Sequence, residues 1–379
     1  MSAQRPRVLL IDHYVPHYDK DAGSRSTWLY LRFMVEMGYN VKFIGANFFS
    51  HQPYTAEMQQ MGVEVLVGEY MAHNIEGWLE DNASYIDAVY VHRPHVAEQF
   101  LPLLEKLNPK PPVIYFGHDL HYLRLHREHV LSGDDAVRRE CDRWRNREFR
   151  VFDRVDHIYY PSDAEVTEIT RQFPRKSAHA IPLYVLDGID APAYSAQDRE
   201  GMIFVAGFNH PPNLDGLRWF VEEIMPKVRE RCPGLLLHVV GSNMPDEVLA
   251  MASNGIAVHG FLSDKELADL YGRVKMVVVP LRFGAGVKGK VVDSLQHRIP
   301  CVTTSIGAEG LPDADTVLHV ADDANAFAAA IAEVEEGAPA VKERLDRFDA
   351  YLENNFGKRK AAAILRRDFG EPLRQRAVP

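Results

Sequence analysis

Short apolar runs alternate with helical stretches along the chain. Val8–Asp12 is a continuous apolar run that ends in an acid, and a glycine-containing loop and the helical stretch Ser26–Met37 follow it. Asn40–Gly45 is the next apolar run. Continuous apolar runs are typical of strands that are buried on both faces of a parallel sheet. The pattern therefore predicts that the chain opens with a β-loop-α-β unit.

The same alternation continues through the first half of the chain and starts again in the second half. Strands and helices that alternate at this rhythm predict an α/β fold with two Rossmann-like, doubly wound sheets. Helices are expected at Leu214–Arg231 and Pro245–Ser253. The further expected strands are Val63–Val67, Ala88–His92, Val113–Phe116, His157–Pro161, Met202–Gly207, Leu235–Gly241, Ile256–His259, Met276–Pro280 and Cys301–Thr304.

The segment Ile181–Gly201, which carries prolines, acids and small residues, is interpreted as a linker between two domains. We expect an N-terminal domain over residues 1–185 and a C-terminal domain over 186–345. Residues 346–379 are expected to form a helical, basic tail that crosses back to the N-terminal domain. A chain of 379 residues exceeds one ordinary hydrophobic core, so two domains agree with its length.

Composition and charge restrict the class of protein. The formal net charge is −10, so the surface as a whole repels nucleic-acid phosphate and no nucleic-acid partner is expected. The three cysteines share no metal-binding spacing, and we expect no metal site. No run of about 18 apolar residues and no signal-peptide core is visible. We expect a cytoplasmic protein, with peripheral association with the inner face of the cytoplasmic membrane as an alternative.

The stretch from Pro280 to Asp293 carries the most informative chemistry. Its glycines let the backbone approach a ligand closely, and the amides at the start of the following helix face the same point. Lysine and arginine charges add to these amides and predict a diphosphate cradle without a metal. The carboxylate of Asp293, one helical turn further on, is suited to clamping a ribose; an ordinary strand-to-helix connection is the alternative. The residues of this cradle are Arg282, Gly284, Gly286, Lys288, Gly289 and Lys290.

This segment resembles glycosyltransferase family 4, the large retaining family with the GT-B fold. The resemblance implies two Rossmann-like domains that face a deep interdomain cleft: an acceptor-side domain over residues 1–185 and a nucleotide-sugar-binding domain over 186–345. It also implies a nucleotide-diphosphate sugar as donor, no cofactor, and a place in cell-surface polysaccharide or glycoconjugate biosynthesis. Asp293 falls at the second position of the family's Glu-x7-Glu motif, and Ala285 falls at the first. The loop looks like the Gly-Ala-Gly-x-Lys-x-Lys variant, in which backbone amides, here including Val287, replace the missing carboxylate near the donor sugar.

The resemblance extends to the first loop of the C-terminal domain. There Gly207 matches a family glycine, but Asn209 stands where family members often carry a cation. Positive charge for the diphosphate is therefore expected from Arg282, Lys288 or Lys290. Phe261 lies in a segment that resembles the family's segment lining the nucleotide base. Its ring either packs on that base or fills the hydrophobic core.

In the N-terminal half, Gly23, Ser24 and Arg25 resemble the family's first loop, where a glycine segment faces the donor phosphates. A flexible loop closed by an N-cap at Ser24 or Ser26 is the alternative. His118 matches the family's active-site histidine, and Asp119 and His121 are expected to complete the site. The expected catalytic residues are His118, Asp119 and Lys290.

Several interpretations of function stay open. Lipid-linked or other glycan acceptors are common in the family, and the arginines between Arg124 and Arg154 form either an acceptor or membrane patch or a salt-bridged helix face. A nucleotide-sugar 2-epimerase with the same fold and a non-catalytic nucleotide-sugar-binding partner are the alternatives to a glycosyltransferase. A dehydrogenase is disfavoured because neither half's first strand leads into Gly-x-Gly-x-x-Gly.

Overall fold

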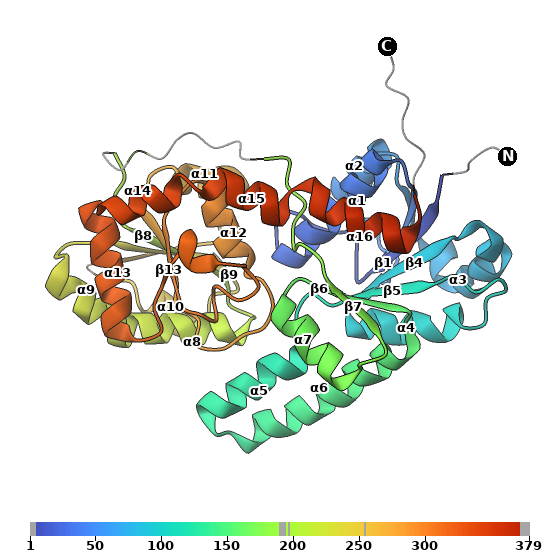
Figure 1. Cartoon of the computed structure of the whole chain (residues 1–379), viewed down its shortest axis with the longest axis horizontal. Helices are drawn as coiled ribbons and strands as arrows, with labels where there is room; N and C mark the ends of the chain where they lie inside the picture. The colour runs from blue at the N-terminus through green and yellow to red at the C-terminus, as the bar shows by residue number, and fades with distance from the viewer. Residues whose placement is uncertain (1–4, 189–194, 196–197, 254, 372–379) are drawn as a thin grey trace, which may run out of the picture. The chain divides into compact units, whose positions relative to one another are not determined.

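The computed structural model describes residues 5–188, 195, 198–253 and 255–371. The chain divides into two compact units. Unit 1 comprises Met1–His126, Asp134–Leu186 and Phe356–Pro379, and unit 2 comprises Arg127–Gly133 and Asp187–Asn355. The centre of the predicted linker and the end of the predicted tail lie outside the described residues. Figure 1 shows the strands of each unit with helices on both faces.

Unit 1 contains a sheet of seven parallel strands in the order β3-β2-β1-β4-β5-β6-β7. The strand order reverses beside β1, since β2 and β4 both pair with it. In an open α/β sheet, ligands bind at the carboxyl ends of the strands beside such a reversal. The strands are β1 Arg7–Asp12, β2 Asn40–Gly45, β3 Glu64–Leu66, β4 Ala88–His92, β5 Val113–Phe116, β6 His157–Tyr160 and β7 Ser177–Ala180.

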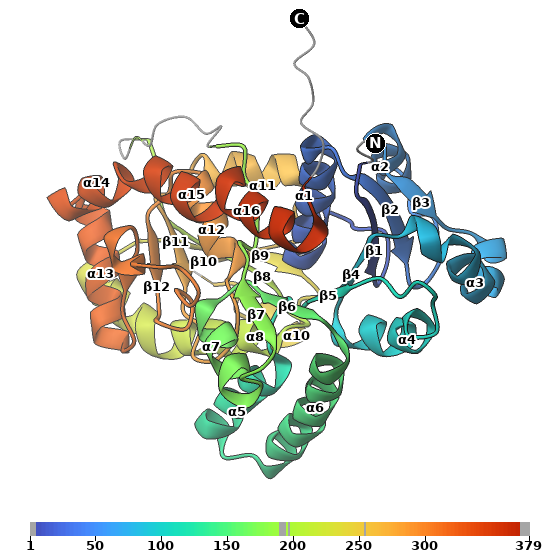
Figure 2. The same ribbon diagram turned by 45° about the vertical axis from the view of Figure 1, so that its right-hand side comes forward.

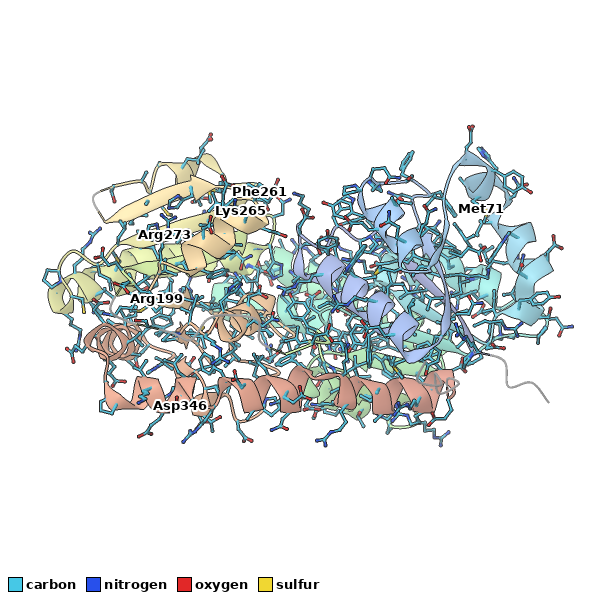
Figure 3. All side chains as sticks on the ribbon, turned by 90° about the horizontal axis from the view of Figure 1, so that it is seen from above. Met71, Arg199, Phe261, Lys265, Arg273 and Asp346 are labelled. Atoms are coloured by element: carbon cyan, nitrogen blue, oxygen red, sulfur yellow. The ribbon has the colours of Figure 1, made fainter. Side chains whose placement is uncertain are left out.

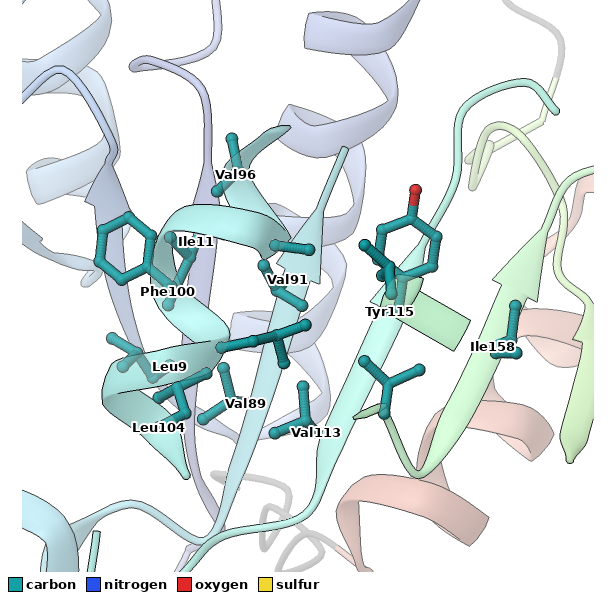
Figure 4. Close-up of a cluster of buried hydrophobic side chains, with 14 of the residues drawn as sticks. Leu9, Ile11, Val89, Val91, Val96, Phe100, Leu104, Val113, Tyr115 and Ile158 are labelled. Carbon is teal, nitrogen blue, oxygen red and sulfur yellow. The ribbon is translucent and has the colours of Figure 1, made fainter. Parts of the chain in front are cut away.

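Helices cover both faces of this sheet because successive strand residues point to opposite sides. Leu9, Ile11 and Val91 point to one face, where they pack with α3, α4, α6 and α7, as Figure 4 shows for part of this core. The intervening residues point to the other face, which α1, α2 and α16 cover (Figure 2). The helices of unit 1 are α1 Ala22–Met37, α2 Tyr54–Gln60, α3 Glu69–Asn82, η1 Ala83–Tyr85, α4 Pro94–Leu104, α6 Asp135–Arg154, α7 Asp163–Gln172 and α16 Lys358–Phe369, and α5 His121–Ser132 begins in it.

Unit 2 contains a sheet of six parallel strands in the order β10-β9-β8-β11-β12-β13, which reverses beside β8. Phe204 and Val278 on one face pack with Leu217, Val228 and Phe327. α12 contacts β11 and β12. The strands are β8 Met202–Gly207, β9 Leu237–Ser242, β10 Ile256–Gly260, β11 Met276–Val279, β12 Cys301–Thr303 and β13 His319–Val320. The helices are α8 Pro211–Trp219, η2 Phe220–Ile224, α9 Met225–Arg231, α10 Asp246–Leu249, α11 Asp264–Tyr271, α12 Gly289–Gln296, η3 Ala314–Thr316, α13 Ala324–Glu336, α14 Pro339–Leu345 and α15 Phe348–Phe356, whose last residue belongs to unit 1.

The two parallel, Rossmann-like sheets confirm the predicted α/β fold class, and three local differences stand out. The helix expected at Leu214–Arg231 begins at Pro211 and contains the π-helical turn η2. The helix expected at Pro245–Ser253 shortens to the four residues of α10. The linker expected from Ile181 begins later, since Ile181 to Leu186 are buried in unit 1.

No helix of the described part of the chain is long and apolar enough to span a bilayer.

Candidate functional site

The candidate donor loop of unit 2, residues 280–288, joins the carboxyl end of β11 to α12. β11 is the neighbour of β8 at the point where the strand order reverses, so the loop lies where ligands bind in such sheets. Gly286 adopts a φ of 72°, in the left-handed region that favours glycine, and Gly284 has a φ of 156°. A Cβ added to Gly284 would lie 3.2 Å from Cε of Lys288, so the side chain of Lys288 lies against the loop.

Lys288 supports the donor loop from inside. Its side chain is 8% exposed, and its ammonium donates to the carbonyl oxygens of Ala285, at 3.0 Å, and of Gly286. Ala285 and Val287 are themselves buried. Lys288 therefore fixes two carbonyl groups of the loop through its buried ammonium.

Lys290 lies in the first turn of α12, and its side chain is partly buried. Its Nζ donates to Oδ1 of Asn213 at 2.7 Å and lies 5.1 Å from the ring centre of Phe204. The Nδ2 of Asn213 donates to the carbonyl of Gly207 at 2.8 Å, which ties α12 to the end of β8. Burial, followed by the nearby charge of Lys288, lowers the pKa of Lys290 to about 7. This amine is thus poised to gain a proton when an anion approaches.

The other residues expected to bind the donor have different surroundings. Arg282 is ion-paired with Asp215, and its Nε lies 2.9 Å from the carboxylate. Asn209 is exposed between β8 and α8, and Asp293 is half-buried on α12. Phe261 is 52% exposed after β10, near Lys265 as Figure 3 shows, so it does not fill the core.

Glu309 lies at the donor loop, although no motif in the sequence pointed to it. Its Oε1 accepts a hydrogen bond from the amide of Gly286 at 3.0 Å, and its other oxygen pairs with Arg127, which also contacts the carbonyl of Gly284. The side chain of Glu309 is 9% exposed. The carboxylate of Glu309 therefore already binds the amide of Gly286, which the sequence predicts to bind the diphosphate. In the sequence, its position six residues after β12, in a loop with two glycines, could have indicated a site residue.

Asp12 and Arg93 form an ion pair at the strand-order reversal of unit 1. Asp12 ends β1, Arg93 follows β4, and Nε of Arg93 lies 2.7 Å from Oδ1 of Asp12. Thr27 donates to the other carboxylate oxygen at 2.8 Å. Burial alone would raise the pKa of Asp12, but Arg93 and His92 hold it well below its usual range. No motif in the sequence pointed to either member of this pair.

His118 lies beside Arg93 and the start of α1. A Cβ at Gly23 would lie 2.9 Å from Nη2 of Arg93 and 3.3 Å from Nδ1 of His118, so the three groups meet closely. Both ring nitrogens of His118 are buried and have no hydrogen-bond partner among the described residues. Burial and the charge of Arg93 lower the pKa of His118 well below its usual value. A neutral imidazole with two unpaired nitrogens is well suited to meet a polar ligand.

The neighbours of Gly23 and His118 are tied into unit 1. Asp21, rather than either serine, is the N-cap of α1 and accepts from the amide of Ser24 at 2.8 Å. The guanidinium of Arg25 lies over the ring of Tyr184. Asp119 pairs with Arg124 at 2.9 Å. The ring of His121 stacks on Trp144 and its Nδ1 lies 3.2 Å from Glu148.

The geometry of one group of residues is close enough to hold a metal ion. One ligand atom from each of Asp12, His92 and His118 lies within 4.8 Å of the others. The carboxylate of Asp12 is already engaged by Arg93, by Thr27 and by the amide of His13 at 2.7 Å. A divalent ion here would lie close to the guanidinium of Arg93. These residues therefore fit an ion-paired network better than a metal centre. The second such group, His157, His179 and Asp368, has the guanidinium of Arg367 bonded to its carboxylate.

The arginines of α6 are mostly paired. Arg143 pairs with Glu140, Arg147 with Glu98 and Arg154 with Glu105. This agrees with the alternative of a salt-bridged helix face. Together with Trp144 and Arg150, residues of this face line a depression of about 940 Å³ beside α6.

The chain resembles known proteins in sequence and in fold. Residues 199–336 match the family model described as Glycosyl transferases group 1. An "Uncharacterized 44.6 kDa protein in cps region" of Klebsiella pneumoniae is 29% identical over 167 residues, which are 42% of this chain and 43% of that protein. The aligned part thus spans less than half of that relative's length.

Two solved structures share the fold over nearly their whole length. Sucrose-phosphate synthase from Thermosynechococcus elongatus has a TM-score of 0.68 at 14% identity and covers 96% of this chain and 98% of its own. HepE from Anabaena, in complex with UDP-glucose, has a TM-score of 0.67 at 13% identity and covers 95% and 99%. The family match over residues 199–336 supports a glycosyltransferase, and the two solved structures show that the Rossmann-like units share the GT-B fold.

Proposed function

We propose that this protein transfers a sugar from a nucleotide-diphosphate sugar to a hydroxyl of a glycan or lipid-linked acceptor. The observation that carries this proposal is the donor loop of unit 2, in which glycine backbone of the left-handed region leads into the first amides of α12, with Lys290 in the first turn of that helix. The UDP-glucose complex of the similarly folded HepE supports this class of donor. The cps region in the name of the Klebsiella relative supports a role in cell-surface polysaccharide synthesis.

Breaking the bond between sugar and diphosphate places negative charge on the leaving diphosphate. The first amides of a helix have no intrahelical partner and carry partial positive charge, so those of α12 would bind phosphate oxygens. Lys290 would add a full charge once protonated, and Lys288 would keep the loop carbonyls turned away from the anion. Such preorganised groups stabilise the transition state more than the ground state.

Transfer is proposed to retain the anomeric configuration through a same-face reaction, in which the leaving phosphate takes the acceptor's proton. Near the donor loop, Asp215 is paired with Arg282, and burial raises the pKa of the Cys301 thiol to about 12, so neither side chain offers a ready nucleophile. NMR of the first-formed product should show the donor's anomeric configuration. An inverted product would contradict retention.

The cradle is proposed to need no divalent ion, because amides and Lys290 supply its positive character. Activity should therefore survive dialysis against EDTA. Loss of activity that returns on addition of Mg²⁺, Mn²⁺ or Zn²⁺ would show that the charge balance proposed for this loop is wrong.

The transfer reaction is distinguished from the alternatives by its need for an acceptor. With a panel of nucleotide sugars, acceptor-dependent release of nucleoside diphosphate is expected. Isomerisation of the donor without an acceptor would indicate a 2-epimerase, and tight donor binding without turnover would indicate a non-catalytic partner.

Work at the cytoplasmic face of a membrane is proposed for a lipid-linked acceptor. Replacement of Arg143, Arg145 and Arg147 by glutamate should then weaken binding to vesicles that contain anionic lipid. Unchanged vesicle binding and unchanged activity would remove the membrane from this proposal.

A further inference from the structure

Four histidines from three separate segments of the sequence gather at the carboxyl edge of the unit 1 sheet. His13 follows β1, His17 lies in the loop between β1 and α1, His51 follows β2, and His95 lies at the start of α4 after β4. Because the strands are parallel, their carboxyl ends meet at one edge of the sheet. We call His13, His17, His51 and His95, together with Tyr14 and Tyr54, the imidazole cluster.

Direct contacts join the members of the imidazole cluster. A ring nitrogen of His95 lies 2.7 Å from one of His13, and the ring centres of His17 and His51 are 4.7 Å apart. His17 also stacks on Tyr54 at 4.5 Å, and Tyr14 bridges the two pairs with ring centres 5.0 Å from His13 and 5.2 Å from His17. The cluster is therefore one continuous group.

The imidazole cluster adjoins the candidate site described above. His13 is the residue after Asp12, and His95 lies two residues after Arg93. The hydroxyl of Tyr14 donates to Asp21, the N-cap of α1, at 3.0 Å. A ligand on the cluster would therefore lie close to the end of the unit 1 sheet that carries the Asp12–Arg93 pair.

We propose that the imidazole cluster binds a neutral, hydroxyl-rich sugar unit of the acceptor. This inference rests on the proposed transfer reaction and names the chemistry of its acceptor. A neutral imidazole offers one donor and one acceptor, which matches a sugar hydroxyl, and the tyrosine rings offer apolar faces to the C–H groups of a sugar.

The charges around the cluster favour a neutral ligand over an anionic one. The guanidinium of Arg93 is engaged by Asp12, and Lys20 is paired with Asp19 at 3.2 Å. Asp19 and Asp21 contribute negative charge on the same side, through Tyr54 and Tyr14. A phosphate or a uronate would thus meet carboxylates without an unengaged cation among these residues.

The protonation of the histidines agrees with this geometry. Burial lowers the pKa of His13 and of His17, with smaller contributions from Arg93 and His51 respectively. Burial and the neighbouring His13 lower the pKa of His95 to about 4. These three rings are therefore neutral at neutral pH, as hydroxyl recognition requires.

One nitrogen in the cluster lacks a partner. The Nε2 of His17 is buried and has no hydrogen-bond partner within the described part of the chain. Buried polar atoms are usually hydrogen-bonded, so an unpaired one next to an exposed edge suggests a missing partner such as a ligand hydroxyl. Phe49, two residues before His51, is 67% exposed and adds an open aromatic surface beside the cluster.

The test follows the imidazole resonances of the full-length protein, labelled at histidine and assigned with single histidine-to-glutamine variants. The probes are methyl α-glucoside, methyl α-mannoside and methyl β-galactoside, with inorganic phosphate and glucuronate as anionic counterparts. At least one neutral glycoside should shift the signals of His13, His17 and His95. The exposed His73 on α3 should not move. Shifts caused only by the anions, or no shift with any neutral glycoside, would overturn the proposal.

A second measurement separates this inference from the proposed function. His17→Ala should raise the acceptor KM about fivefold, the effect of losing one neutral hydrogen bond, while donor affinity and acceptor-independent donor hydrolysis stay unchanged. His73→Ala is the matched control. A wild-type protein that does not turn over any donor would refute the proposed function alone. If the wild-type protein is active and His17→Ala leaves its acceptor KM unchanged, the acceptor subsite alone is refuted.

Discussion

Lys290 is the side chain whose protonation a bound diphosphate should change. Its pKa is lowered to about 7, first by burial, so the free protein holds it partly neutral at neutral pH. An anion favours the charged amine, raises this pKa and draws in a proton. Affinity for a nucleoside diphosphate should therefore be greatest below pH 7 and fall as the pH rises above it. Calorimetry in buffers of different ionisation enthalpy will detect the proton uptake.

Lys290→Met should remove this pH dependence and cost at least about 2–3 kcal/mol of transition-state stabilisation. Lys342→Met, at an exposed position on α14 of the same unit, serves as the control. If Lys290→Met retains the affinity and pH profile of the parent protein, the amine does not contact the phosphates.

The Asp12–Arg93 ion pair is expected to contribute to the free energy of unfolding. Arg93→Met would leave a buried carboxylate without its cation, at a cost of about 2–4 kcal/mol, since a quarter of the Arg93 side chain is exposed to solvent. The pKa of Asp12 is lowered in the folded protein, so the pair contributes stability above the unfolded-state pKa and loses it as the pH falls.

Urea denaturation should thus show the largest difference between Arg93→Met and the parent at neutral pH, and a shrinking difference below about pH 4. The double variant Asp12→Asn with Arg93→Met should recover part of the loss, because no charge is then left buried. Equal destabilisation at all pH values would argue against the ion pair as the cause.

At the scale of elements, Glu309 links the turn after β12 to the donor loop through its hydrogen bond with the amide of Gly286. Glu309→Gln keeps an oxygen that can accept from the amide of Gly286 but removes the negative charge. Binding of UDP and of inorganic pyrophosphate should tighten at least about threefold, because a like charge is removed from beside the anion. Fluorescence or calorimetric titration will measure it, with the exposed Glu230→Gln on α9 as control. Weaker binding would mean that Glu309 shapes the loop rather than competing for it.

Elements with a clear local signal were predicted, and those without one were not. β1 and β11 are continuous apolar runs, so their burial could be inferred from residue type. β7 has the sequence Ser-Ala-His-Ala and is only partly buried, and β13 has two residues; both depend on pairing with a neighbouring strand.

The candidate site shows the same division. The candidate donor loop could be recognised because its glycines and lysines are adjacent in sequence at the end of a strand, and its binding of a donor stays a prediction. The contact between Asp12 and Arg93 joins residues 81 positions apart, and it exists only because β1 and β4 are neighbours in the sheet. A single sequence does not encode that pairing as a visible pattern.

At the scale of the whole chain, the last helix belongs to the first unit. Leu365 and Ala361 of α16 are buried against the unit 1 sheet, together with Phe369. Leu365→Ala should lower the unfolding free energy by about 2–4 kcal/mol. Nucleoside diphosphate affinity, a property proposed for unit 2, should not change. The exposed Lys360→Ala is the control, and a fully stable Leu365→Ala would show that α16 is dispensable for unit 1.

The backbone leaves unit 1 near Leu186 and returns at Phe356, where the amide of Leu186 donates to the carbonyl of Phe356 at 2.9 Å. A protease that nicks the chain once, at a cleavage sequence inserted after Gly188, would therefore produce two bands on a denaturing gel but a single peak in size-exclusion chromatography. The C-terminal fragment would remain anchored through α16, so the nicked protein should behave as a split protein whose halves need no engineered tag to stay together.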